Sequence, residues 1–302
     1  MKNHSLTGSL MVLGAAVLWG TTGTAQSLAP PHLSAYWIGA LRLAVAAVFF
    51  TLYTVCTEPH RQWRQDLRRL CWPEVWLAGA CIAGYNLAFF AGVKASGVAV
   101  GTAIALGSGP VWAGLLQWLV LRHIPHPAWW LGTLLAVSGG SWMVLGGGTQ
   151  QAFSLHGTLL CLAAGLGYAG YAQLNQRLVQ AASPATATLG VFGAAALLAV
   201  PVALGLSGSI HMTATDMLVV GYLGVVTTGI SYLLFSHALQ RIASATAVTL
   251  ALAEPLVAFV LAVWLLHEPA PWSAYAGLTL VLAGLACVIA AEISGRKNTT
   301  NR

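Results

Sequence analysis

The residues whose chemistry stands out are Glu254 and Pro255, which interrupt a long apolar run near the carboxyl end. The run from Ala245 to Leu266 is otherwise apolar or small and is long enough to cross a bilayer as one helix. A carboxylate at mid-membrane costs about 2.5–3.5 kcal/mol, so it should face a water-filled cavity or a polar partner. Pro255 cannot donate to Ala251 and frees that carbonyl. This pair favours a polar pathway; the alternative is a buried glutamate acting as structural glue.

Composition places the chain in a membrane. Hydrophobic residues make up 58% of its 302 residues and charged residues only 7%, whereas soluble domains carry roughly 25% charge. Successive apolar runs predict ten transmembrane helices, at residues 7–29, 33–56, 75–94, 97–121, 128–147, 156–178, 184–206, 216–238, 242–266 and 271–291. We therefore expect an all-α polytopic membrane protein with no stretch left for a soluble domain.

The net charge of +6 indicates orientation rather than nucleic-acid binding. If the amino terminus is cytoplasmic, Lys94 alone lies on the opposite side, and Arg42 alone lies within a span. The remaining basic residues fall on the cytoplasmic side: Lys2, Arg61, Arg64, Arg68, Arg69, Arg122, Arg177, Arg241, Arg296, Lys297 and Arg302. The positive-inside rule then predicts that both termini are cytoplasmic. No nucleic-acid partner is expected.

One long polar segment, Glu58 to Glu74, separates the second and third predicted spans. Its basic residues are Arg61, Arg64, Arg68 and Arg69. These side chains could lie on anionic headgroups as part of an interfacial helix. Topology alone explains them equally well, so the sequence leaves both interpretations open.

A pattern of small residues ending in glutamine occurs in the first predicted helix and again in the sixth. Its members are Gly20, Gly23, Ala25 and Gln26, and then Gly167, Gly170, Ala172 and Gln173. Small residues let two helix backbones approach closely, and a glutamine on the same segment can bond across the contact. The recurrence indicates an internal repeat.

A displacement of 145 residues aligns helices 3 to 5 with helices 8 to 10. It pairs Gly79 with Gly224, Gly84 with Gly229, Phe90 with Phe235, Pro110 with Pro255, Gly132 with Gly277 and Gly139 with Gly284. We therefore predict two five-helix repeats, residues 1–147 and 148–302, of which the second is inverted because five is odd. Inverted repeats place the substrate site at their interface, often at helices interrupted in matching positions. Here those positions are around Pro110 and Pro255.

Polar and aromatic residues at mid-span are the candidates for a solute pathway. Beside Glu254 and Pro255 they are Pro110, Tyr85, Asn86, Trp19, Gln26, Tyr168, Gln173, Ser231 and Tyr232. Plain packing is the simpler explanation for any single aromatic residue among them. Arg42 is a candidate charge partner, because it either snorkels to the surface or faces the bundle and pairs with an acid.

Motifs for other chemistry do not occur in the sequence. It contains neither a G-x-x-x-x-G-K-[ST] nucleotide loop nor an H-E-x-x-H zinc motif. His123 and His126 share a loop, but two ligands without an acid are a weak metal signal. An intramembrane enzyme would normally show a second acid near Glu254. We expect no cofactor, no metal and no enzymatic activity.

The sequence resembles the EamA-type family of the drug/metabolite transporter superfamily over nearly its whole length. The resemblance rests on Arg42 and on three phrases, Ala16-Val17-Leu18-Trp19-Gly20, Leu252-Ala253-Glu254-Pro255-Leu256-Val257 and Leu266-His267-Glu268-Pro269. It implies ten helices with both ends inside and a central cavity formed by helices 1, 3, 4, 6, 8 and 9. It also implies export of amino acids or other small metabolites, sometimes of toxic compounds, from the bacterial cytoplasm.

The chain departs from the family pattern in and beside helix 4. Arg122-His123-Ile124 stands where the first repeat usually has a glutamate. The run from Ser96 to Pro110 is also longer than its usual counterpart. A contact of the first repeat is thus expected to be missing.

We therefore expect a multi-pass secondary transporter of the bacterial inner membrane that exports amino acids or similar small metabolites by alternating access. Glu254 would bind a substrate amine or carry a proton. The expected partners are a small metabolite, membrane lipid and protons. Efflux of drugs by the same fold is one alternative, and a ligand-binding membrane sensor without transport is another. No pattern in the sequence predicts an oligomeric state.

Overall fold

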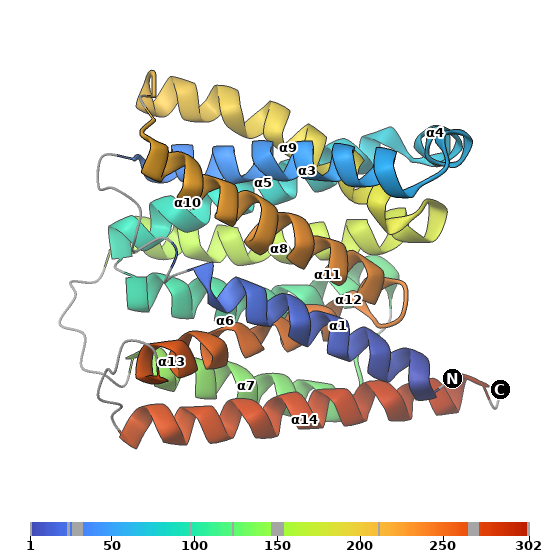
Figure 1. Cartoon of the computed structure of the whole chain (residues 1–302). Coiled ribbons are helices and arrows are strands. Elements are labelled where there is room, and N and C mark those ends of the chain that lie inside the picture. The colour runs from blue at the N-terminus through green and yellow to red at the C-terminus, as the bar shows by residue number, and fades with distance from the viewer. Residues whose placement is uncertain are drawn as a thin grey trace.

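The computed structural model describes residues 2–22, 25, 33–96, 98–122, 124–145, 154–210, 212–264 and 272–300. The regular structure in these ranges is helical (Figure 1). The elements are α1 (Lys2–Gly20), α3 (Ala35–Thr57), α4 (His60–Arg69), α5 (Trp72–Ser96), α6 (Val98–Leu121), α7 (Pro127–Leu145), α8 (Leu155–Ala181), α9 (Pro184–Ser207), α10 (Ala214–Gly224), η1 (Val225–Ile230), α11 (Ser231–Leu239), α12 (Ser244–Leu250), η2 (Ala251–Ala253), α13 (Glu254–Trp264) and α14 (Trp272–Thr300).

Several helices are suited to crossing a membrane. In the described part of the chain, seven stretches qualify by length and composition: Ala35–Thr57, Trp72–Ser96, Val100–Val120, Pro184–Ser207, Ala214–Leu239, Ser244–Leu261 and Tyr275–Ile293. Ser5–Gly20 is a shorter apolar helix. α7 and α8 overlap two further predicted spans, although α8 carries several amides near its end. The chain is thus a multi-pass membrane protein, while ten crossings and cytoplasmic termini remain predictions.

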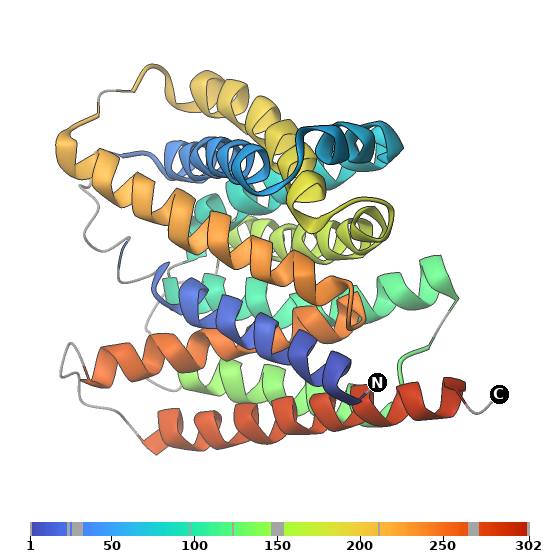
Figure 2. The ribbon, with the colours of Figure 1, turned by 45° about the vertical axis from the view of Figure 1, so that its right-hand side comes forward.

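The long helices run side by side with a different pair at each edge of the bundle. Both views place α3 beside α9 at one edge and α7 beside α14 at the other (Figures 1 and 2). α1, α6, α8 and the composite α12 to α13 helix lie between these edges. The start of α1 and the end of α14 lie at the same end of the bundle, which is also the end where α4 lies.

The contacts between helices repeat when the two halves are exchanged. The second helices of the halves, α3 and α9, contact each other, and so do the fifth helices, α7 and α14. α5, the third helix of the first half, contacts α8, the first helix of the second half, and its counterpart α11 contacts α1 in return. Likewise α6 contacts α8, and its counterparts α12 and α13 contact α1. This reciprocity is what a pseudo-two-fold axis between two repeats produces.

Glycines make the two-fold relation visible at the interface of α7 and α14. A Cβ on Gly132 would lie 2.8 Å from the Gly284 carbonyl oxygen, and one on Gly139 would lie 2.7 Å from the Gly277 oxygen. Exchanging the halves converts the first contact into the second, because Gly132 corresponds to Gly277 and Gly139 to Gly284. The repeated glycines therefore serve close approach of two helix backbones.

The structure corrects two expectations about helix boundaries and does not test the expected boundary between the repeats. Pro110 was predicted to interrupt its helix, but α6 runs through it as one helix, so the break exists only in the second half. The first long helix ends at Gly20 rather than at residue 29, and Gln26 lies outside the described residues. The predicted repeat boundary at 147 and 148 also falls outside them, so the division stays a prediction.

Gly284→Ala should destabilise the protein by about 1–3 kcal/mol, because the new methyl group would meet backbone that cannot move aside. Its Cβ would lie 2.5 Å from the Ala136 nitrogen. Gly193→Ala is the matched control, since nothing lies within 4 Å of a Cβ there, and it should be neutral or stabilising by about 0.5–1 kcal/mol. Chemical unfolding in detergent measures both, and equal effects would contradict the close contact.

Candidate functional site

Glu254 stands at a local break in the helix. α12 ends at Leu250, three residues of 3₁₀-helix follow, and α13 begins at Glu254 itself. The backbone N–H of Glu254 donates to the Ala251 carbonyl oxygen. Pro255 has no N–H with which to serve that carbonyl, so the tighter 3₁₀ turn supplies the missing bond. The proline thus determines both the break and the position of the acid at the first turn after it.

α1 approaches this break closely through Gly20. A Cβ on Gly20 would lie 2.6 Å from Val257 Cβ and 3.0 Å from the Glu254 carbonyl oxygen. The absence of a side chain at Gly20 is therefore what lets α1 contact the start of α13. Trp19, next to it, is brought to the same region and is 6% exposed.

Trp19 is part of an aromatic cluster built by helices from both halves. Its ring lies 5.1 Å from the ring of Tyr232, 5.7 Å from Phe235 and 6.1 Å from Tyr168, measured between centroids. The ring of Tyr85 from α5 lies 5.4 Å from Tyr168. Several of these contacts are edge-on, the geometry in which aromatic rings attract each other. Sequence-predicted residues from α1, α5, α8 and α11 thus meet in one place.

Two polar atoms of this cluster have no hydrogen-bond partner among the described residues. They are Trp19 Nε1 and the hydroxyl oxygen of Tyr168, both buried. Tyr168 is 8% exposed. A buried polar group without a partner costs about 1–3 kcal/mol, and in native proteins such groups call for an explanation, such as an unbound ligand or water. The pair therefore offers donors to a bound molecule.

Arg42 is buried and faces the bundle instead of extending to the surface. Its Nε donates to the Thr228 hydroxyl at 2.9 Å, and its Nη2 donates to the Thr227 hydroxyl at 3.2 Å and carbonyl at 3.4 Å. The guanidinium carbon also lies 5.9 Å from the ring centroid of Phe90. None of the acids in the described ranges lies within ion-pair distance of it. Neutral oxygens and an aromatic face satisfy this cation.

The threonines that hold Arg42 belong to a π-helical segment, η1. The hydroxyls of Thr227 and Thr228 both donate to the Leu223 carbonyl oxygen, at 2.9 and 2.7 Å. The Thr227 carbonyl oxygen accepts from Ser231 Oγ at 2.7 Å. The threonine and serine hydroxyls of this region thus bond to backbone carbonyl oxygens where the helix is widened. The Thr227 carbonyl oxygen also accepts from Arg42. Single-turn π segments of this kind are frequent at functional sites.

Close packing brings α3 within reach of η1. A Cβ on Gly224 would collide with Val45 Cβ, and one on Gly229 would lie 2.5 Å from the Phe49 ring. In the first half, a Cβ on Gly79 likewise meets Ala194 Cβ at 2.7 Å, but one on Gly84 meets nothing within 4 Å. The π segment, which receives an arginine from the first half, therefore distinguishes the second half from the first.

Glu254 and Arg42 carry opposite charges and lie within electrostatic range of each other. Glu254 is partly exposed and lies within electrostatic range of Arg42, Tyr85 and Tyr168. Arg42 is also within range of Tyr232. The two charges do not form a contact ion pair, so Arg42 does not take up the Glu254 carboxylate. An acid, a base and aromatic faces can bind a small molecule that carries both charges.

Three other predicted polar residues form hydrogen bonds within the protein. Asn86 Nδ2 donates to the Ile82 carbonyl in its own helix, and Ser231 Oγ donates within η1. The Gln173 side-chain oxygen accepts from Ser244 Oγ at 2.6 Å, which joins α8 to the start of α12. Each of these bonds stabilises a helix or joins two helices.

Two cavities lie away from the aromatic cluster. One, of about 10 Å³, lies between α6, α7 and the break at Leu252 and Pro255, and is roughly large enough for one water. A hollow of about 360 Å³ lies among the ends of α3, α5, α8 and α9 and is lined in part by Tyr36, Lys94 and His156. Neither contains Glu254 or Arg42 among its lining residues.

Comparison with known proteins agrees with this architecture. The sequence model of the EamA-like transporter family matches residues 6–145 and again residues 155–290. The chain belongs to the EamA-like transporter family. Two matches in one chain fit the two-repeat arrangement of an EamA protein, and members of this family are transporters rather than enzymes.

Individual relatives extend over nearly the whole chain. The "Uncharacterized transporter YwfM" of Bacillus subtilis (strain 168) is 36% identical over 284 residues, which is 94% of this chain and 94% of that protein. A solved structure described as "Crystal structure of protein" has a TM-score of 0.78 at 19% identity, over 94% of this chain and 98% of the other. At that identity the likeness concerns the fold alone.

Three further residues have roles that the sequence did not predict. Thr227, Thr228 and Phe235 share the mid-span stretch of Ser231 and Tyr232, where hydroxyls and aromatic faces suggested a cavity lining. The structure shows that Thr227 and Thr228 hold Arg42 and that Phe235 completes the aromatic cluster. Knowledge of which helix faces meet was needed to assign these roles.

Thr228→Val should lower the free energy of unfolding by about 1–3 kcal/mol, because it leaves the buried Nε of Arg42 without an acceptor while keeping side-chain shape. Thr279→Val is the control, since that exposed hydroxyl bonds only to a carbonyl in its own helical turn. Urea unfolding in detergent micelles measures both variants. Equal stabilities of the two variants would contradict the role of Thr228.

Tyr168→Phe and Tyr171→Phe should have opposite effects on stability. The first removes a buried hydroxyl that has no protein partner, so stability should hold or rise. The second removes the hydroxyl that accepts from Asn175 Nδ2 at 3.1 Å and should cost about 0.5–1.5 kcal/mol. Thermal unfolding of both variants measures the difference. A loss at Tyr168 as large as at Tyr171 would show that its hydroxyl is structurally bonded.

Proposed function

We propose that this EamA protein is a secondary transporter of amino acids or similar small metabolites and that it works by alternating access. One observation carries the proposal: unpartnered donors and opposite charges from both halves converge on one aromatic cluster. Trp19, Arg42 and Tyr85 come from the first half, and Tyr168 and Glu254 from the second. Transporters with inverted repeats bind substrate at such an interface, near interrupted helices.

The chemistry of the cluster supports a substrate with both an amine and a carboxylate. Glu254 suits an ammonium group and Arg42 suits a carboxylate. The aromatic rings add apolar surface, and the free Nε1 of Trp19 and hydroxyl of Tyr168 add orientation. An amino acid combines these features in one small molecule. Glu254 would alternatively carry a proton that drives the cycle.

We infer export as the direction and the bacterial inner membrane as the location, both from the family resemblance. The aromatic cluster also supports a second candidate, efflux of amphipathic toxic compounds, because ring faces bind flat apolar molecules and organic cations. A third, a membrane sensor that binds without transport, is distinguished by flux. All three candidates use the same residues, so they differ in what crosses the membrane, and a flux assay separates them.

If Glu254 carries the coupling proton, the Glu254→Gln variant should lose pH-driven accumulation of substrate while retaining exchange across the membrane, because glutamine keeps the shape of the side chain but cannot be charged. The measurement is flux of a panel of labelled amino acids into liposomes containing the full chain, with and without an imposed pH gradient. Glu74→Gln is the matched control, since Glu74 lies near the start of α5 in an exposed ion pair with Arg177.

Each result has a defined meaning. Continued pH-driven accumulation in Glu254→Gln removes the proton role. Equal competition by substrate analogues without an amine removes the amine-binding role. If no amino acid crosses but drugs do, the efflux candidate replaces the first. Ligand binding without any flux supports the sensor.

A further inference from the structure

The helix α4 at the end of the bundle has one inward face. Trp63, Asp66, Leu67 and Leu70 recur at the three- and four-residue spacing of one helix side. Asp66 is 6% and Leu70 4% exposed, and Leu67 packs against the main core. The segment thus folds as an amphipathic helix attached to the protein, and not as an irregular loop between spans.

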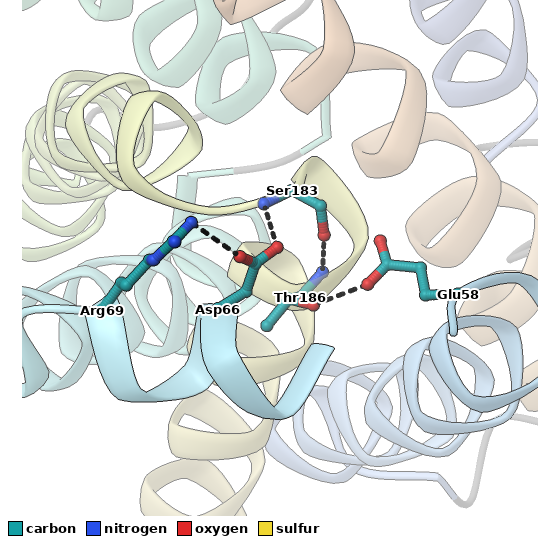
Figure 3. A network of polar contacts seen from close by, with 5 residues as sticks. All are labelled: Glu58, Asp66, Arg69, Ser183 and Thr186. Atoms are coloured by element: carbon teal, nitrogen blue, oxygen red, sulfur yellow. Dashed lines mark hydrogen bonds and ion pairs between the residues drawn. The ribbon is translucent and has the colours of Figure 1, made fainter. Parts of the chain in front are cut away.

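Two acids, one on α4 and one at the end of α3, bond to the start of α9. Asp66 Oδ2 accepts from the backbone N–H of Ser183 at 3.1 Å, and its other oxygen lies 3.7 Å from Arg69 (Figure 3). Glu58, at the end of α3, accepts from the Thr186 hydroxyl at 2.9 Å. The acids on this corner therefore face inward and are engaged with the protein.

The outward face of α4 is left uniformly cationic. Arg61, Arg64, Arg68 and Arg69 are exposed, and the polar residues between them are neutral glutamines. Asp66 is the one acid within α4, and it is turned to the inside. Apart from the pairing of Asp66 with Arg69, no acidic side chain of the helix offsets the charge on the outer surface.

The orientation of α4 differs from that of the long helices. Figure 1 looks almost along its axis, whereas α3, α5 and α9 run across the view. α4 therefore lies across the end of the bundle, close to the plane of a membrane that these helices would span. Trp72 and Trp76, next along the chain, are 46% and 44% exposed. Exposed tryptophans at a span end are typical of the headgroup region.

We propose that the outer face of α4 is a binding surface for anionic phospholipid headgroups. A topological signal requires only that basic residues lie near the end of a span. It does not require a folded helix in the membrane plane, with its single acid turned inward and bonded to another helix. Charge complementarity to anionic lipids, whose surface attracts nearby arginines, accounts for both features. The bonds to Ser183 and Thr186 then link headgroup binding to the position of α9.

The test is native mass spectrometry of the full chain in detergent, titrated with phosphatidylglycerol or phosphatidylcholine. The variant is Arg61→Gln with Arg64→Gln and Arg68→Gln, which spares Arg69 because it pairs with Asp66. The control removes the same charge outside α4, by Arg122→Gln, Arg296→Gln and Lys297→Gln. Affinity for phosphatidylglycerol should fall about fivefold per arginine removed from α4. Phosphatidylglycerol affinity should stay unchanged in the control variant. Phosphatidylcholine affinity should stay unchanged in both variants.

Unchanged phosphatidylglycerol affinity in the α4 variant would overturn the proposal, as would an equal loss in the control. Competition by soluble glycerol phosphate at the same concentration would assign the surface to a free phosphate instead. If the α4 variant fails to fold, a salt titration of the native protein decides. Raising NaCl from about 0.05 to 0.5 M should remove the preference for the anionic lipid, and a persistent preference would contradict the proposal.

Discussion

The buried guanidinium of Arg42, which has no contacting carboxylate, is the interaction on which the backbone and packing of η1 in the second half depend. Arg42 is stabilised by neutral oxygens, and those oxygens are available because Thr227 and Thr228 lie on a widened helical turn. The turn can lie beside α3 only because glycines at 224 and 229 leave room for Val45 and Phe49. Local backbone geometry, helix packing and buried charge are therefore mutually dependent. Because neutral groups satisfy the arginine, Glu254 is not bound in a contact ion pair.

The two halves share a packing scheme but differ in what they hold. The contacts of α7 with α14 and of α3 with α9 obey the exchange of repeats. The helix break, the π segment and the glutamate occur in the second half alone within the described residues. The first half contributes an unbroken α6, the arginine and part of the aromatic cluster. The repeated packing thus provides a shared scaffold, to which the first half contributes Arg42 and the second half Glu254.

Much of the architecture followed from the sequence because its causes are local. Apolar runs, repeated glycines and the proline after Glu254 each act within a helix or between equivalent helices, so pattern alone predicted them. Pro110 was misjudged as a break because a proline removes one bond without forcing the helix to end. The π segment and the unpartnered donors of Trp19 and Tyr168 were beyond prediction. Both depend on which helix faces meet, and no periodicity encodes that.

The glycine contact of α7 with α14 has a mechanical consequence for any rocking of the halves. Backbone there meets backbone at 2.5–2.8 Å from a notional Cβ, and backbone cannot change rotamer to absorb a shift. At the opposite edge, α3 and α9 meet through side chains such as Phe50 and Phe192, whose ring centroids are 5.0 Å apart. Side chains can re-pack during a movement. In the alternating-access cycle proposed above, the α7 and α14 edge would therefore act as the pivot, and the largest displacements would belong to the edge of α3 and α9.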